Sequence, residues 1–354
     1  MTIPVIIDTD VALDDYMAIL YLLLNPAVEV IGITTTGVGA AHLSAGTQNV
    51  LNLLNLANQT GIPVAPGTSA PLSFSNVFPS SWRTVVDNLY YIPLAQSAAS
   101  AQPPGSAVQF LHDTLTQYGS PVTLLSIGGG TNLGTLFQTY NHVSWPQYIS
   151  RIFMMGGAIT APGNVNAFNP DYNNTVAEWN IFIDPLGANT VLQSEVPVTL
   201  IPLDASNQAQ LDLDFYETLM GMVASPQGNA IQNAVAAFIF AGLSTQLETI
   251  AQPAQSVNGY YLWDPLAAIA LTDTHNQIVT IAQETLSVNL TLNEEQDASG
   301  AIQTNSGCSN GVVTTVDGNA AKVALLSTWT GYSKDVIAAR LRSPRARRSS
   351  RASK

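Results

Sequence analysis

The stretch that decides the fold is PVIIDTDVALDDYMAIL, residues 4–20. An apolar run with strand character delivers Asp8, Asp10, Asp14 and Asp15 within eight positions and then passes into an apolar segment with helical spacing. Asp14 and Asp15 fall at the expected start of the helix, where the dipole favours each negative charge by about 0.3–1 kcal/mol. Capping explains one or two acids but not four, because clustered like charges repel and are costly to bury. A hard divalent cation such as Ca²⁺ accounts for the others, since it takes about six to eight oxygen ligands.

The composition is that of a globular protein with a large core. The chain has 354 residues, of which 46% are hydrophobic and only 10% are charged. Its single cysteine, Cys308, excludes an internal disulfide framework and a multi-cysteine metal site. No apolar run reaches the roughly 18–20 residues of a membrane span, so no membrane partner is expected. With no leader at the start we expect a cytoplasmic protein, although a secreted protein after leader removal would have the same composition.

Charge is distributed very unevenly along the chain. Seven of the 11 lysines and arginines lie between Arg340 and Lys354, a segment without any acid. The preceding residues hold only four cations against all 24 acids, a net charge of −20. A body this acidic excludes nucleic acid as an expected partner, because such binding depends on phosphate neutralisation. We therefore predict one catalytic domain over residues 1–338 and a basic, disordered tail over residues 339–354.

Strand-like and helix-like segments alternate along the chain. Expected strands, nearly continuous in apolar residues, are residues 4–8, 28–36, 62–67, 121–128, 151–157 and 196–204, with shorter β-rich segments after about 272. Expected helices are 14–24, 42–58, 107–118 and 132–140, a further helix opening at Pro185, and a largely helical stretch before about 272. Residues 68–104 and 158–177 look like two long excursions, which in a compact domain are more often functional than idle. This pattern predicts an α/β fold with a single, mostly parallel, Rossmann-like central sheet flanked by helices.

Polar residues gather where the expected strands end. GGGTN follows TLLSI, GGA follows IFMM, and Asp204 follows TLIPL, in addition to the acids after the first strand. Ligands of parallel sheets bind at the carboxyl ends of the strands, so we expect the active site at this edge.

Four motifs in register resemble the nucleoside hydrolase family, the Ca²⁺-dependent nucleoside N-ribohydrolases. They are the D-x-D-x-x-x-D-D turn, SIGGGTN followed by MMGGA, AEWNIFIDP, and WDPLAAIA, which together run from residue 5 to about 270. Trp82 in FPSSWR, Trp179 in AEWN and Trp263 in GYYLWDP are similar to the purine-preferring inosine–adenosine–guanosine branch. The resemblance implies hydrolysis of purine ribonucleosides to free base and ribose, and a homodimer or homotetramer.

The resemblance also implies a metal site. Ca²⁺ would be bound by the carboxylates of Asp10, Asp15 and Asp264 and by the backbone carbonyl of Ile127. Asp10 would in addition be the general base that takes a proton from water, and Asp8 would support the turn from outside the site.

Substrate-binding residues follow from the same motifs. Asp14, Asn164, Glu178 and Asn180 would hold the ribose hydroxyls, although Asn173 or Asn174 of the Asn-rich excursion could serve in place of Asn164. Trp82 and Trp263 would sandwich the base and act as catalytic residues, with Trp179 lining the pocket.

The physical chemistry agrees with these roles. Cleavage of an N-glycosidic bond passes through an oxocarbenium-like sugar, which anionic oxygens stabilise, and a purine that picks up a proton is attracted by indole faces. A pyrimidine has no imidazole nitrogen to protonate, so a site of tryptophans should prefer purines. His42, His112, His142 and His275 lie outside every motif, and we expect each to serve packing or the surface.

Two positions depart from the family pattern. Ala12 stands where the family has Gly or Asn, and Gly39 stands where it has Asn or Asp. These departures leave open a nucleoside-binding protein with weak or no turnover. A second alternative is a haloacid-dehalogenase-type phosphatase with Asp8 as nucleophile and Asp10 as acid/base, but the body offers it only Lys322 and Lys334, both outside any strand-end motif.

Overall fold

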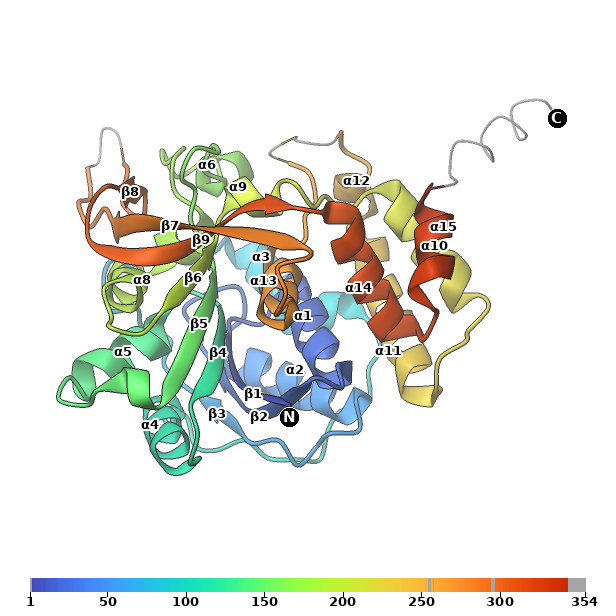
Figure 1. Cartoon of the computed structure of the whole chain (residues 1–354), viewed down its shortest axis with the longest axis horizontal. Coiled ribbons are helices and arrows are strands. Elements are labelled where there is room, and N and C mark those ends of the chain that lie inside the picture. The colour runs from blue at the N-terminus through green and yellow to red at the C-terminus, as the bar shows by residue number, and fades with distance from the viewer. Residues whose placement is uncertain (1, 254–255, 257, 294–296, 343–354) are drawn as a thin grey trace.

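The computed structural model describes residues 2–253, 256, 258–293 and 297–342 of the chain (Figure 1). The strands are β1 Ile3–Thr9, β2 Val28–Thr35, β3 Val64–Pro66, β4 Val122–Ile127, β5 Ile149–Met155, β6 Val198–Ile201, β7 Val279–Val288, β8 Ile302–Thr304 and β9 Cys308–Val316. The helices up to the middle of the chain are α1 Leu13–Leu24, α2 Leu43–Leu56, α3 Ser80–Asp87, α4 Ala107–Gln117, α5 Thr131–Thr139, α6 Val165–Phe168, α7 Trp179–Ile183 and α8 Pro185–Leu192. Those that follow are α9 Leu203–Ser206, α10 Leu213–Val223, α11 Ala230–Thr245, α12 Leu247–Ile250, α13 Trp263–Thr272, α14 Gly318–Thr330 and α15 Lys334–Arg342, and two 3₁₀ turns are η1 Leu89–Tyr91 and η2 Trp145–Gln147.

The strands of the described residues form one sheet in the order β3-β2-β1-β4-β5-β6-β9-β7-β8. Strands β1 to β6 and β9 run parallel, whereas β7 is antiparallel to β9 and β8 is antiparallel to β7. The chain proceeds outward from β1 to β3 and then returns to β4 on the other side of β1, so the direction of winding switches between β1 and β4. Ligands of open parallel sheets bind at such a switch point. The α/β, mostly parallel fold predicted from the sequence is confirmed.

Hydrophobic cores fill both faces of the sheet. Ile7 of β1 and Leu125 of β4 face the core formed with α1, α2 and α13, while the neighbouring Ile6 and Leu124 face the core formed with α4, α5 and α8. Because side chains alternate across a strand, nearly continuous apolar strands are needed to fill two faces. Helix α1 is itself enclosed, since Asp14 is the one residue between Leu13 and Leu23 that is not buried.

The carboxyl-terminal part of the chain differs from the β-rich expectation. The strands β7, β8 and β9 are present, but they are followed by α14 and α15. Trp329 of α14 is fully buried in the main core, so tertiary packing stabilises a helix whose small residues gave little periodic signal. The boundary predicted at residues 338/339 falls inside α15, which continues to Arg342, and residues 343–354 of the predicted tail lie outside the described residues.

None of the described helices is long and apolar enough to cross a membrane.

Candidate active site

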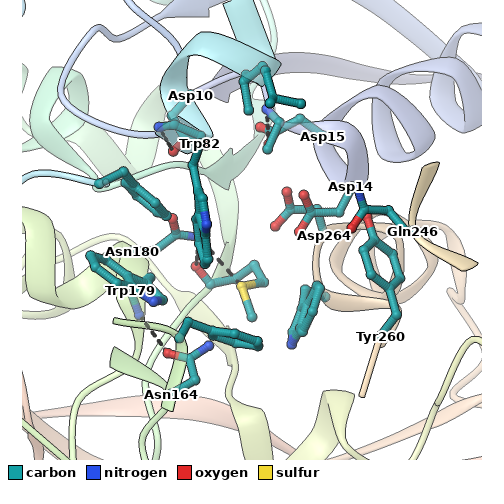
Figure 2. Close-up of a pocket in the computed structure, with 18 of the residues that line it drawn as sticks. Asp10, Asp14, Asp15, Trp82, Asn164, Trp179, Asn180, Gln246, Tyr260 and Asp264 are labelled. Carbon is teal, nitrogen blue, oxygen red and sulfur yellow. Dashed lines mark hydrogen bonds between the residues drawn. The ribbon is translucent and has the colours of Figure 1, made fainter. Parts of the chain in front are cut away.

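A cavity of about 410 Å³ opens at the carboxyl ends of the strands around the β1/β4 switch point (Figure 2). Its lining residues are Asp10, Ala12, Asp14, Asp15, Ala40, Phe78, Trp82, Val85, Val86, Tyr90, Met155, Asn164, Phe168, Glu178, Trp179, Asn180, Gln246, Thr249, Tyr260, Trp263 and Asp264. Every substrate-binding and catalytic residue predicted from the sequence is in this set. Ile127 is not, although it ends β4 directly beside Thr9 of β1.

The turn after β1 is held by its own acids. Val11 has a φ of 71°, an unfavourable left-handed conformation for a β-branched residue. Asp15 stabilises the turn because its carboxylate accepts hydrogen bonds from the hydroxyl of Thr9 and, at 2.8 Å, from the backbone N–H of Ala12. Ala12 has no side chain to cap α1, so Asp15 caps the start of the helix from inside its first turn.

Three carboxylates form what we call the acid cluster: Asp14, Asp15 and Asp264. One oxygen from each lies within 4.8 Å of the others. Asp14 and Asp15 open α1 and Asp264 opens α13, so two helix N-termini point their dipoles at the same place. Burial raises the pKa of Asp14 to about 7, and burial with the charges of neighbouring acids raises the pKa values of Asp15 and Asp264 well above the usual range.

The acid cluster fits a metal ion. The Asp264 Oδ1 atom is buried and has no hydrogen-bond partner among the described residues. Such an unpaired acceptor beside two further carboxylates is a costly arrangement in the protein alone. A hard divalent cation bound here would pair with the unpaired acceptor and would reverse the pKa shifts, since it would favour the ionised carboxylates.

Asp10 lines the same cavity, and its side chain lies within hydrogen-bonding reach of Asp15 of the acid cluster. Its Oδ2 accepts a 2.7 Å hydrogen bond from the backbone N–H of Ala40, and burial raises its pKa to about 6. A Cβ atom at Gly39 would lie 1.8 Å from the same Oδ2. The absence of a side chain at position 39 therefore makes room for the carboxylate of Asp10.

Arg83 fixes the loop that receives Asp10. Its guanidinium donates hydrogen bonds to the carbonyls of Gly37, at 2.7 Å, and Ala41, at 2.8 Å. Since Arg83 follows Trp82 on α3, these bonds couple the position of that helix to the loop.

Asp8 lies outside the cavity lining. Its Oδ1 accepts hydrogen bonds from Thr34 Oγ1 and Asn132 Nδ2, both at 2.7 Å, and the Asn132 amide also donates to the carbonyl of Thr35. Burial raises the pKa of Asp8 to about 6. Asp8 thus joins β1, β2 and the start of α5 below the site.

Of the four residues predicted to hold ribose, Asp14 lies on α1, whereas Asn164, Glu178 and Asn180 lie in or directly after the second excursion. Glu178 caps α7 and accepts hydrogen bonds from the backbone N–H groups of Gly157, Asn180 and Ile181. Asn164 Oδ1 accepts from the backbone N–H of Trp179 at 3.1 Å, which joins the start of the excursion to its end. Burial raises the pKa of Glu178 to about 7. Asn174 instead bonds Ala177 and Ser299, away from the cavity lining.

Five rings form what we call the aromatic wall: Phe78, Trp82, Phe168, Trp179 and Trp263. Phe78 stacks on Trp179 with ring centroids 4.5 Å apart, and Phe168 contacts both Trp82, at 5.8 Å, and Trp263, at 6.3 Å. Trp82 is 37% exposed, whereas Trp179 is buried. Trp82 and Trp263 therefore lie on either side of Phe168.

Both excursions are anchored by buried or half-buried carboxylates. Asp184 accepts hydrogen bonds from the backbone N–H groups of Leu72 and Ser73 in the first excursion. Asp204 accepts hydrogen bonds from the hydroxyl of Thr160 and from the backbone N–H groups of Ile159 and Thr160 in the second, and these bonds lower its pKa. The aromatic wall is thus attached to the sheet at defined points.

Sequence reasoning missed several lining residues: Phe78, Tyr90, Phe168, Gln246, Thr249 and Tyr260. One of them carries a signal, because Phe168 lies four positions after the predicted Asn164, the spacing of one helical turn. The four histidines lie outside the lining, as expected. Lys322 bonds Asp212 at 2.7 Å and lies outside the cavity, as does Lys334, so the lysine that a phosphatase requires is missing from this site.

Comparisons with known proteins agree with this geometry. Residues 5–325 match the family model of the inosine-uridine preferring nucleoside hydrolases. The pyrimidine-specific ribonucleoside hydrolase RihA of Escherichia coli O139:H28 is 31% identical over 241 residues, which cover 67% of this chain and 70% of RihA. RihA of Salmonella paratyphi B is 34% identical over 216 residues, covering 60% and 63% respectively.

Solved structures share the fold. The plant nucleoside hydrolase PpNRh1 superposes with a TM-score of 0.76 at 23% identity, covering 94% of this chain and all of that one. The purine-preferring ribonucleoside hydrolase from Gardnerella vaginalis superposes with a TM-score of 0.72 at 23% identity, covering 95% and 99%. The family model spans nearly the whole described chain, and the chain belongs to the inosine-uridine preferring nucleoside hydrolase family.

Proposed function

We propose that this nucleoside hydrolase cleaves the N-glycosidic bond of purine ribonucleosides to free base and ribose, with Ca²⁺ as cofactor. The observation that supports this best is the composition of the cavity. The cavity is lined by carboxylates and by the aromatic wall, and no histidine, lysine or arginine of the described residues lines it.

The carboxylates suit the chemistry at the sugar. As the bond to the base breaks, positive charge develops on the ribosyl ring, and anionic oxygens stabilise it. Asp10, Asp15, Asp264 and the carbonyl of Ile127 would hold Ca²⁺, which would supply Lewis acidity when bound. Asp10 would act as general base and take a proton from the attacking water.

The residues beside the acid cluster hold the sugar. Asp14, Asn164, Glu178 and Asn180 accept or donate hydrogen bonds to the ribose hydroxyls in this proposal. Glu178 and Asn164 are both tied to backbone N–H groups, so their positions are set before the substrate arrives.

The aromatic wall carries the proposed purine preference. Indole faces attract cations by about 0.5–2 kcal/mol, so Trp82 and Trp263 favour a purine that becomes protonated at its imidazole ring. The name of RihA indicates pyrimidine specificity in that relative, whereas the Gardnerella protein is named purine-preferring. The two names therefore leave the preference of this chain to experiment.

The test is release of reducing sugar from inosine, guanosine, adenosine, uridine and cytidine, each with Ca²⁺ and with a chelator. We expect purine nucleosides to be hydrolysed at least about tenfold faster than pyrimidine nucleosides, and chelation to abolish the reaction in all cases. Faster hydrolysis of uridine or cytidine contradicts the purine preference but leaves the reaction type in place. Release that is unaffected by chelation contradicts the metal.

A binding protein without turnover is the second candidate, because Ala12 and Gly39 depart from the family pattern. Ala12 lines the cavity, and neither residue can hydrogen-bond a nucleoside through its side chain. Calorimetry that detects Ca²⁺-dependent nucleoside binding, together with no sugar release, would support this candidate.

Replacing Trp263 by alanine is expected to lower kcat on inosine by about 2–30-fold, the range that corresponds to a cation–π contribution of about 0.5–2 kcal/mol, and to change KM less. Trp263→Phe, which keeps a ring against Tyr260, is the matched control and should retain most of the activity. Unchanged turnover of inosine by Trp263→Ala would rule out stacking on this ring as a catalytic factor.

The oligomeric state and the compartment stay predictions. Light scattering on the purified full chain measures whether it forms the expected homodimer or homotetramer.

A further inference from the structure

The turn η1 has an unusual backbone for residues that carry side chains. Leu89, Tyr90 and Tyr91 have φ values of 53°, 54° and 59°, so three consecutive non-glycine residues are left-handed. L-residues visit this region singly and at a cost, because Cβ approaches the following carbonyl oxygen. Such strain persists only where the surrounding structure enforces it, and it clusters at functional sites.

The strained turn distributes its three side chains to three different environments. Leu89 is buried in the main core, and Tyr91 is 68% exposed. Tyr90 lines the cavity, with its ring edge-on to the buried Tyr16 at 6.2 Å and 88°. A right-handed turn would send these side chains in other directions, so the left-handed conformation is what brings Tyr90 to the site.

The Tyr90 hydroxyl is engaged as an acceptor. The backbone N–H of Leu13, in the first turn of α1, donates a 3.2 Å hydrogen bond to the Tyr90 oxygen. Burial and the nearby carboxylate of Asp14 raise the pKa of the phenol, so it keeps its proton. That proton remains to be donated elsewhere, and the bond from Leu13 polarises the hydroxyl and makes it a better donor.

The departing base needs such a donor. When the bond between C1′ and nitrogen breaks, its electron pair goes to the base. The oxygen of water forms the new bond at C1′, and the proton that this water loses ends on the base or in solvent. The cavity is rich in carboxylates, and no cationic side chain of the described residues lines it. A base that departs before it gains a proton carries negative charge, and the lining side chains of the described residues can stabilise that charge only as neutral donors such as the phenol.

We propose that Tyr90 contacts the nucleobase, donating its phenolic hydrogen to the acceptor next to the glycosidic nitrogen, N3 of a purine or O2 of a pyrimidine. The proposal rests on the nucleoside hydrolysis proposed above. The ribose is a less suitable partner for the phenol. Its hydroxyls can donate hydrogen bonds to the carboxylates of Asp14 and Glu178. Both base types present an acceptor at this position, so the contact aids departure of either one and does not set the purine preference.

The experiment compares Tyr90→Phe with the wild-type full chain on two substrates in the presence of Ca²⁺. Inosine has a base that needs the hydrogen bond, whereas p-nitrophenyl β-D-ribofuranoside has a leaving group that is stable as an anion. We expect kcat on inosine to fall about 10–100-fold and kcat on the p-nitrophenyl riboside to change less than about twofold. Tyr91→Phe, in the same turn but exposed, is the matched control and should leave both rates unchanged.

Each other outcome overturns the inference in a recognisable way. Equal losses on both substrates mean that Tyr90 only supports α1 through Leu13, and unchanged rates on both mean that the phenol does not touch the base. Circular dichroism shows whether Tyr90→Phe still folds. If it does not, Tyr90→Trp is the second variant, because its ring carries an N–H donor but cannot accept the hydrogen bond from Leu13. We expect Tyr90→Trp to recover part of the inosine rate. Wild-type protein that hydrolyses neither substrate contradicts the proposed function itself, together with this inference.

Discussion

Asp10→Ala is expected to lower kcat on the best nucleoside by at least about 10³-fold while the protein stays folded. A positioned general base contributes about 10²–10⁴-fold, and Asp10 is in addition a proposed ligand of Ca²⁺. Asp10 is 3% exposed and burial raises its pKa to about 6, so its charge is costly to bury. Removal of this carboxylate therefore takes away a destabilising buried charge. Steady-state kinetics and a thermal melt of the same preparation measure both effects.

The matched control is Asp113→Asn on α4, an exposed carboxylate far from the cavity lining, which should leave kcat unchanged. A value of kcat for Asp10→Ala above about one tenth of the wild-type value would show that another group takes the proton from water.

Chelated protein is expected to lose stability as the pH rises from about 4 to about 7, by at least about 5 °C in Tm. Burial raises the pKa values of Asp8 and Asp10 to about 6 and that of Asp14 to about 7, from an ordinary value of 3.8. At a pH between the unfolded pKa of about 3.8 and these folded pKa values, the folded protein holds protons that the unfolded chain has released. The resulting stabilisation is fully present below the unfolded pKa and is lost as the pH passes through the folded pKa.

Ca²⁺ should reverse this trend. In the proposed function Ca²⁺ binds the ionised carboxylates of the folded protein, and a ligand at about one hundred times its Kd adds about 2.7 kcal/mol of stability. The Tm increase caused by Ca²⁺ should therefore be larger at pH 8 than at pH 5. Asp264→Asn removes one charge of the acid cluster and should abolish the Tm increase caused by Ca²⁺. A chelated wild type that melts at a higher temperature at pH 8 than at pH 5 would contradict the assignment of raised pKa values to these carboxylates.

The acids could be predicted from the sequence because their signal is local. Asp10, Asp14 and Asp15 follow one strand, and parallel strands end at the same edge of a sheet, so the fold class places them near the other strand ends. Asp264 opens a helix instead, and only the resemblance of WDPLAAIA to the nucleoside hydrolase family assigned it to the site. The grouping of Asp14 with Asp15 and Asp264 in one acid cluster was not predicted. It depends on the angle at which α1 meets α13, which core packing decides.

The missed residues depend on backbone geometry that composition does not reveal. Tyr90 enters the cavity only because of the left-handed turn at residues 89–91, and no glycine marks that turn. Gln246 and Thr249 reach it from the junction of α11 and α12, in a stretch that the sequence shows only as helical. Similarly, the hydrogen bond from Ala40 to Asp10 follows from the shape of a loop and has no sequence signature beyond Gly39.

The division of the cavity between core and excursions has an evolutionary consequence. The acid cluster is carried by α1 and α13, which pack together inside the main core, so a change there would disturb the whole fold. Phe78, Trp82 and Phe168, in contrast, are carried by surface excursions that are attached through carboxylates such as Asp184 and Asp204. Descendants of such a scaffold can exchange the excursions and acquire a new substrate range, while inheriting the bond-breaking apparatus unchanged.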